Sequence, residues 1–258
     1  MDYECQCSGN NNGCSNAILF NILSQADIDE PAKSKLNYLP PKRCHCEMHR
    51  IVRLKTPTDT CWVASSVLVK TVYFMKSLPA FQQLPPKDQL VLLQSCWVPL
   101  FILGLAQEHV CFEVEDTTAP SMLQRILLNH QDSKGSDREQ PTMAGVQKLK
   151  TCLKKFWNLD LSPKEYAYLK GTMIFNPDVP GLQAAPFINS LQQEAQNALG
   201  EVLLLLHPED QRCFPHVLLA SSSLKSITSD LITELFFRPI IGKAHLLDLL
   251  ADMLFSRC

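Results

Sequence analysis

The stretch Phe74-Met75-Lys76-Ser77-Leu78-Pro79-Ala80-Phe81, followed by Leu84, Asp88-Gln89 and Leu92-Leu93, joins two apolar segments through a proline-containing turn. Before the turn, apolar residues recur at helical spacing over residues 64–78, and Pro79 ends the run. After it, Pro85-Pro86 favours the start of a second helix, because proline suits a first turn whose amide has no partner. The sequence therefore predicts two consecutive helices joined by a short turn.

The second helix of this pair is expected at the centre of the fold. Residues 86–107 are apolar on nearly every side, as in a helix surrounded by other elements. The most apolar part, residues 90–106, contains Gln94, Ser95 and Pro99 and falls short of the ~20 apolar residues that a membrane span needs. We therefore expect a buried core helix and no membrane association.

Further helices are indicated by spacing and by start signals. Ser162-Pro163-Lys164-Glu165 is a capping box with proline at the first helical position. Residues 109–114 alternate like a short strand, and residues 131–141 are typical of a loop. The predicted helices cover residues 57–78, 86–107, 121–129, 146–156, 163–176, 187–206, 215–237 and 244–255. The expected fold class is all-α, a layered helical bundle with a minimal β-hairpin.

Residues 1–55 differ from the rest of the chain. Asn10-Asn11-Asn12-Gly13 and Pro40-Pro41 break any regular pattern, and only residues 17–23 have a compact apolar face. We expect a weakly ordered N-terminal arm with one short helix, followed by a folded domain over residues 56–258.

The composition argues against enzymes and nucleic-acid binders. The 258 residues include 24 basic and 26 acidic side chains, so no basic excess marks a DNA or RNA surface. The chain has only nine glycines, so glycine-rich phosphate-binding loops are not expected. No catalytic motif occurs. The start Met1-Asp2-Tyr3-Glu4 lacks the features of a signal peptide. We predict neither an enzyme nor a cofactor, and no secretory targeting.

The eleven cysteines allow two interpretations. Cys5-Gln6-Cys7 and Cys44-His45-Cys46-Glu47-Met48-His49 bring soft metal ligands together, yet the chain contains no C-x-x-C pair, and structural zinc sites usually present two matched pairs. Ordinary reduced thiols are the favoured interpretation, with a zinc module as the alternative. No metal site is predicted.

The stretch from Phe74 to Leu93 resembles the signature of nuclear receptor ligand-binding domains, in which aromatic, basic, apolar and Asp-Gln positions keep a fixed register. Glu165-Tyr166, leading through Leu169-Lys170 to Phe175-Asn176-Pro177-Asp178, resembles the eighth helix of the same family. Leu249-Leu250-Ala251-Asp252-Met253-Leu254 resembles its terminal activation helix. The resemblance covers the chain from about residue 57 onward and implies the layered antiparallel helical sandwich of that family.

Three more stretches are similar to a receptor subfamily that lacks the zinc-finger DNA-binding domain. They are Leu169-Lys170-Gly171-Thr172, Pro177-Asp178-Val179-Pro180-Gly181-Leu182-Gln183 and Leu235-Phe236-Phe237-Arg238-Pro239-Ile240-Ile241-Gly242. The absence of C-x-x-C pairs agrees, because a receptor DNA-binding domain needs two four-cysteine zinc modules. The resemblance implies a transcription regulator that does not itself contact DNA.

The resemblance also implies a groove that receives an L-x-x-L-L helix of a partner. Lys76 would face the carbonyl end of that helix and Asp252 its amide end, each worth roughly 0.3–1 kcal/mol through the helix dipole. Each buried leucine would contribute roughly 1.5–3 kcal/mol. Most of the family has glutamate where this chain has Asp252, which is shorter by about 1.5 Å, so a weaker clamp is expected. The implied groove residues are Val72, Lys76, Phe81, Gln89, Leu90, Leu93, Leu249, Asp252 and Met253.

The chain also contains the complementary half of this interaction. Leu19-Phe20-Asn21-Ile22-Leu23 and Leu123-Gln124-Arg125-Ile126-Leu127 are both L-x-x-I-L, a conservative variant of the docking helix. Docking is favoured for Leu19, Ile22 and Leu23, whereas Leu123, Ile126 and Leu127 suit docking and core packing equally. The hypothesis is a corepressor that docks on other nuclear receptors, excludes coactivators and recruits corepressors, in the nucleus and also the cytoplasm.

Two alternatives remain open. The first is a receptor domain gated by a small lipid, with a cavity lined by Val67, Met75, Trp97 and Phe101. The second is a structural helical adapter that keeps the signature only for its fold.

Overall fold

The elements of the computed structural model surround one apolar helix, as the sequence predicts. The structure describes residues 50–118, 140–208 and 213–256. The helices are α2 (Pro57–Ser77), α3 (Pro79–Gln82), α4 (Pro86–Gln107), α6 (Met143–Leu159), α7 (Pro163–Ile174), α8 (Ala185–Leu206), α9 (Cys213–Leu224), α10 (Ser229–Ile232), the π-helix η1 (Thr233–Phe237), α11 (Arg238–Ile241) and α12 (Leu246–Phe255), and the strands are β1 (Arg50–Leu54) and β2 (Val114–Thr118). The predicted fold class is confirmed.

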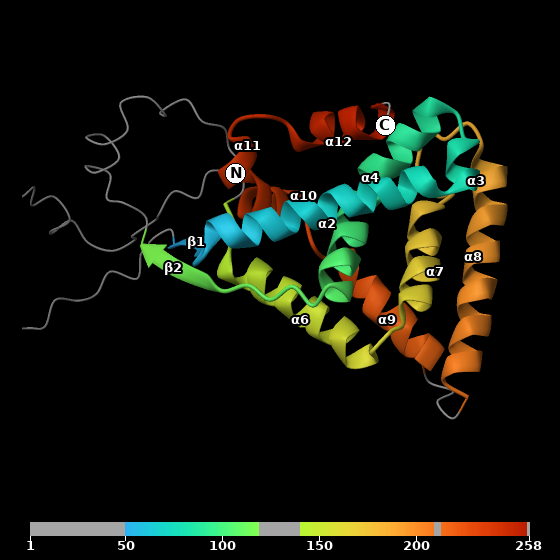
Figure 1. Cartoon of the computed structure of the whole chain (residues 1–258), viewed down its shortest axis with the longest axis horizontal. Helices are drawn as coiled ribbons and strands as arrows, with labels where there is room; N and C mark the ends of the chain where they lie inside the picture. The colour runs from blue at the N-terminus through green and yellow to red at the C-terminus, as the bar shows by residue number, and fades with distance from the viewer. Residues whose placement is uncertain (1–49, 119–139, 209–212, 257–258) are drawn as a thin grey trace, which may run out of the picture. The chain divides into compact units, whose positions relative to one another are not determined.

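Helix α4 passes through the middle of this assembly (Figure 1) and packs against α2, α6, α7, α9 and α12. Leu92, Leu100, Phe101, Ile102 and Leu103 on it are completely buried. Among the described helices it alone is long and apolar enough to cross a membrane, and 67% of its most apolar stretch is buried inside the protein. That degree of burial is what a core helix requires.

The two strands form a small antiparallel sheet, in which Arg50 pairs with Thr118 and Leu54 with Val114. The predictions placed the strand at residues 109–114 and joined the strands as a hairpin. Both details were wrong, since α2 to α4 separate the strands and β2 begins only at Val114. Because β1 lies within the expected arm and pairs with β2, the compact unit that contains it begins at His49 rather than at residue 56.

One predicted helix, over residues 215–237, is interrupted in the structure. Ser222, Ser223 and Ser226 donate hydroxyl hydrogen bonds to backbone carbonyls three residues earlier, and Thr228 caps α10 by accepting from the Leu231 amide. Such local hydroxyl bonds compete with a continuous helix. The π-helix that follows carries two aromatic residues of the core, Phe236 and Phe237. Their ring centres lie 5.8 and 5.3 Å from the ring centre of Phe101.

The predicted capping box at the start of α7 is confirmed. The Ser162 hydroxyl accepts from the Glu165 amide at 3.3 Å, and the Glu165 carboxylate accepts from the Ser162 amide at 2.6 Å. The second carboxylate oxygen of Glu165 lies 3.0 Å from Nε2 of His207, which follows α8. The buried Glu165 therefore links the start of one helix to the end of the next.

Asp88 makes a similar connection between α4 and α8. Its side chain is completely buried, and its carboxylate accepts from the Gln183 amide at 2.9 and 3.0 Å and from the Ala184 amide at 2.8 Å. Ala184 is the residue before α8, so the carboxylate satisfies amides that the helix start leaves without partners.

We expect Asp88→Ala to lower the free energy of unfolding by about 3 kcal/mol, because two backbone amides lose their acceptor at roughly 1–3 kcal/mol each. Urea denaturation measures the change. Asp88→Asn, which keeps one acceptor oxygen, is the control and should cost about half as much. A loss for Asp88→Ala within about 0.5 kcal/mol would contradict this role.

Candidate coregulator groove

The end of α2, the turn through α3 and the first turns of α4 are held together by side-chain amides. Nε2 of Gln89 donates to the carbonyls of Phe81 at 2.9 Å and Leu84 at 3.1 Å. Nε2 of Gln82 donates to the carbonyl of Lys76 at 2.6 Å. The turn that the signature predicts is therefore fixed by its own polar residues, and Gln89 serves backbone carbonyls of this turn.

The apolar walls of the predicted groove come from these same three elements. Val72 on α2, Phe81 on α3 and Leu93 on α4 are each only 1% exposed, and Leu90 is half-buried. Walls of an open groove would be accessible to water. Another part of the chain therefore covers them.

Helix α12 packs against both α2 and α4 (Figure 1). Leu246, Leu250 and Leu254 are buried along one face of it, and Met253 packs against the core from a half-buried position. Residues 250–254 thus present apolar side chains at the spacing of an L-x-x-L-L helix, with methionine in place of the middle leucine.

Lys76 holds the carboxyl end of this helix. Its Nζ donates to the carbonyls of Met253 at 3.1 Å and Ser256 at 2.9 Å. A cation placed at the last carbonyls of a helix is stabilised by the helix dipole. Lys76 therefore makes with α12 the contact that the family resemblance implies for the partner helix.

In this structure Lys76 bonds to the end of α12, and the expected clamp of Lys76 and Asp252 on a partner helix stays a prediction. Asp252 is exposed and directly precedes Met253, whose carbonyl bonds to Lys76, so both residues lie at the same end of α12. Leu249 is 38% exposed and turns away from the buried face. A role for Asp252 toward a partner helix stays a prediction for a state in which α12 has moved.

Sequence reasoning did not single out Leu250 and Leu254, which the structure buries on α12. The signal was present, because Leu250-Ala251-Asp252-Met253-Leu254 has the same i, i+3, i+4 spacing as the two L-x-x-I-L motifs. The prediction instead took Leu249, Asp252 and Met253 of this segment as groove residues.

The two docking motifs lie outside the described residues. Leu19, Ile22 and Leu23 belong to the segment before residue 50, and Leu123, Ile126 and Leu127 to residues 119–139. Their role stays a prediction from the sequence.

The four residues of the expected lipid cavity are core residues. Val67, Met75, Trp97 and Phe101 are at most 2% exposed, and the ring of Phe101 packs against the π-helix aromatics. Val67 also lies so close to α4 that a methyl group on Gly104 would come within 2.5 Å of it. Packing this close favours a filled interior at these positions.

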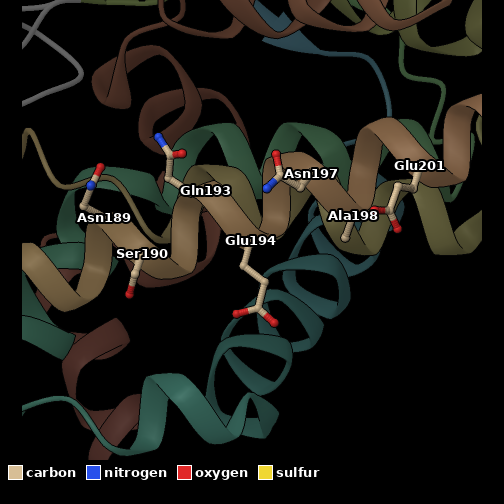
Figure 2. A pocket seen from close by; sticks show the side chains of 7 residues that line it. All are labelled: Asn189, Ser190, Gln193, Glu194, Asn197, Ala198 and Glu201. Atoms are coloured by element: carbon tan, nitrogen blue, oxygen red, sulfur yellow. The ribbon is translucent and has the colours of Figure 1, made fainter.

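An open hollow of about 770 Å³ lies along one face of α8. Figure 2 shows that its seven lining side chains all come from that helix and do not converge on a common point. They are Asn189, Ser190, Gln193, Glu194, Asn197, Ala198 and Glu201. This polar helix face offers no apolar seat for a leucine-faced helix.

Metal ligands do not gather in the part of the chain that the structure describes: no three histidine, cysteine or carboxylate side chains there could hold one ion. Cys61, Cys96, Cys111 and Cys152 are free thiols. Burial raises the pKa of the Cys96 thiol well above its usual range, so it stays protonated. The Cys5 and Cys44 clusters lie outside the described residues.

The fold and the groove define a class of protein. The chain belongs to the family described as the ligand-binding domain of nuclear hormone receptor, whose model matches residues 47–241.

Within that family the chain is similar to nuclear receptor subfamily 0 group B member 2 of Homo sapiens, with 52% identity over 246 residues, covering 93% of each chain. It is 47% identical to the Rattus norvegicus protein of the same name, over 98% of this chain and 97% of that one. It is also 37% identical to group B member 1 of Callithrix jacchus, over 99% of this chain and 58% of that protein.

We expect Lys76→Leu to release the end of α12, because two charge-assisted hydrogen bonds to its last carbonyls are lost. Amide hydrogen exchange over residues 246–256 should become about tenfold faster, a loss of roughly 1.4 kcal/mol at a half-buried site. Lys70→Leu is the matched control on the same helix, since Lys70 pairs instead with Glu108 at 2.9 Å. Equal exchange in both variants would show that Lys76 does not anchor α12.

Proposed function

We propose that this protein is a transcriptional corepressor that binds other nuclear receptors through leucine-faced helices and excludes coactivators from their grooves. Regulation of transcription without enzyme activity follows from the family. Recruitment of corepressors by the folded domain, the absence of direct DNA contact, and presence in the cytoplasm as well as the nucleus belong to the same proposal.

The observation that carries the proposal is the pair of hydrogen bonds from Lys76 to the end of α12. An incoming coactivator helix would have to displace these bonds and the buried Leu250 and Leu254. Each leucine is worth roughly 1.5–3 kcal/mol when buried. A receptor domain whose own groove is filled from within is a poor recipient for coactivators.

In this proposal, the two L-x-x-I-L motifs bind the coactivator grooves of other receptors. A helix with Leu19, Ile22 and Leu23 on one face has the pattern that such grooves receive. If the motif occupies the groove of a second receptor, coactivators that use the same groove are excluded by mass action. Repression then needs no DNA contact by this chain.

The test is a binding experiment with isolated receptor ligand-binding domains. We expect the intact chain to bind at least some members of a panel, and an excess of a coactivator peptide carrying L-x-x-L-L to release it. Binding that is unaffected by saturating peptide would refute docking in the groove and favour the adapter alternative.

A further inference from the structure

A cavity of about 220 Å³ lies where α4 ends, α6 ends and α7 begins. Its lining includes Gln107, His109, Trp157, Asp160 and Tyr166. None of its lining residues belongs to α2, α3 or α12, so the cavity is separate from the coregulator groove. Nothing in the docking mechanism proposed above uses it.

Helices α4 and α6 both end at this cavity. Each is closed by a residue other than glycine with a left-handed backbone conformation. His109 has φ of 50°, and the amides of His109 and Val110 donate to the carbonyls of Ala106 and Leu105, the pattern that closes helices with a left-handed residue. Asp160, which ends α6, has φ of 47°. Left-handed backbone favours glycine, yet at both positions the chain places a polar side chain against the cavity.

The aromatic wall of the cavity is held in a fixed position. Nε1 of Trp157 donates to the carbonyl of Ala106 at 3.1 Å, which orients the indole. The His109 ring stacks on it, with ring centres 6.3 Å apart and an angle of 21° between the planes. A flat ring can pack against such a surface.

Tyr166 supplies a hydrogen-bond donor. The residue is only 4% exposed and lines the cavity, yet its hydroxyl makes no hydrogen bond to any other residue of the described segments. Burial and the negative charge of Asp160 raise the pKa of this hydroxyl to about 12, so it stays protonated at neutral pH. The hydroxyl is therefore available to donate to a group that enters the cavity.

The lining of the cavity includes one acidic side chain, and Lys170, which is not in the lining, donates from Nζ to Oε1 of Gln107 at 2.7 Å. Asp160 is the one carboxylate among the lining residues, and the lining contains neither lysine nor arginine. A ligand with a positive group would be attracted by Asp160, and one with a carboxylate would be repelled.

We propose that this cavity binds a small aromatic amine. Its ring lies against Trp157 and His109, an oxygen on the ring accepts from the Tyr166 hydroxyl, and its ammonium group faces Asp160.

The test uses a matched pair of probes, 3-methoxybenzylamine and 3-methoxybenzoate, which differ in the sign of their charge. The chain has three tryptophans, Trp62, Trp97 and Trp157, so the indole N–H resonances of the ¹⁵N-labelled protein report on the site separately. We expect the amine to shift the Trp157 resonance with Kd on the order of 1 mM, as suits a fragment of this size, and the benzoate to leave it unchanged.

Two variants separate binding from folding. Tyr166→Phe removes only the hydroxyl, and Asp160→Asn keeps a residue that tolerates left-handed backbone. Each should weaken binding of the amine at least about fivefold, in line with one lost polar interaction. Asn189→Ala, on the exposed face of α8, should leave it unchanged.

Equal shifts with both probes, or no Trp157 shift with the amine, would overturn the proposal. Full binding by both Tyr166→Phe and Asp160→Asn would do the same. Neither result bears on receptor docking, because that proposal rests on the leucine motifs and not on Tyr166 or Asp160.

Discussion

Replacing Leu19 and Leu23 together with alanine is expected to lower the affinity of the chain for receptor ligand-binding domains by about 100-fold or more. Each leucine that enters an apolar groove contributes roughly 1.5–3 kcal/mol, and each 1.4 kcal/mol changes the affinity tenfold. Isothermal titration calorimetry with an isolated receptor domain measures the effect. The orientation contributed by charges at the helix ends is smaller, roughly 0.3–1 kcal/mol each, so apolar contacts dominate the result.

The motif provides its own control. Phe20 and Asn21 occupy the two positions between the leucine and isoleucine of the motif, on the other side of a helix. Phe20→Ala or Asn21→Ala should change the affinity by less than about threefold. Leu123→Ala with Leu127→Ala tests the second motif in the same assay. If all four leucine replacements in one chain leave the affinity unchanged, the docking mechanism is wrong.

Removing residues 246–258 is expected to open the groove of the chain itself. A tethered helix with a dissociation constant of about 10 μM and an effective concentration of roughly 1 mM weakens the binding of a competing peptide by roughly 100-fold. We therefore expect a labelled L-x-x-L-L peptide to bind the shortened chain roughly 100-fold more tightly than the intact chain. Fluorescence anisotropy measures both affinities, and a thermal melt checks that the shortened chain is folded.

Two further variants identify the groove as the peptide site. Lys76→Glu in the shortened chain should abolish the gain, because it places a negative charge at the carbonyl end of the peptide helix. In the intact chain, Leu250→Ala with Leu254→Ala should reproduce part of the gain. Leu247→Ala, at a position that is 40% exposed on α12, should not. Equally weak peptide binding by intact and shortened chains would show that α12 does not regulate access.

The sequence predicted the elements that local signals define. Prolines mark the first turns of α2, α4 and α7, and the Ser162–Glu165 capping box marks the start of α7, so these starts could be read directly. Pro79 was taken only as the end of the preceding helix, so the short helix α3 was missed. The break after Leu224 was missed because the apolar spacing continues across it while the serine hydroxyls compete locally. The pairing of β1 with β2 was missed because the pairing is between strands far apart in the chain.

The candidate site, like the fold, could be predicted from the sequence only in part. Val72, Phe81 and Leu93 could be assigned to the groove from the family signature, and in the structure all three are buried on α2, α3 and α4. The position of α12 could not be predicted, because one apolar helix can pack in more than one place and the choice depends on small differences in tertiary contacts. The cavity beside Tyr166 was missed for a related reason, since its residues come from three separate helix ends.

Photocrosslinking from position 20 tests the central claim most directly. A benzoylphenylalanine in place of Phe20 stands between the docking residues of the first motif, and mass spectrometry locates its attachment on a bound receptor domain. We expect the crosslinks to fall on the two receptor helices that form the coactivator groove, and a saturating L-x-x-L-L peptide to abolish them. Crosslinks on another face of the receptor, or crosslinks that persist in the presence of the peptide, would contradict the proposed mechanism.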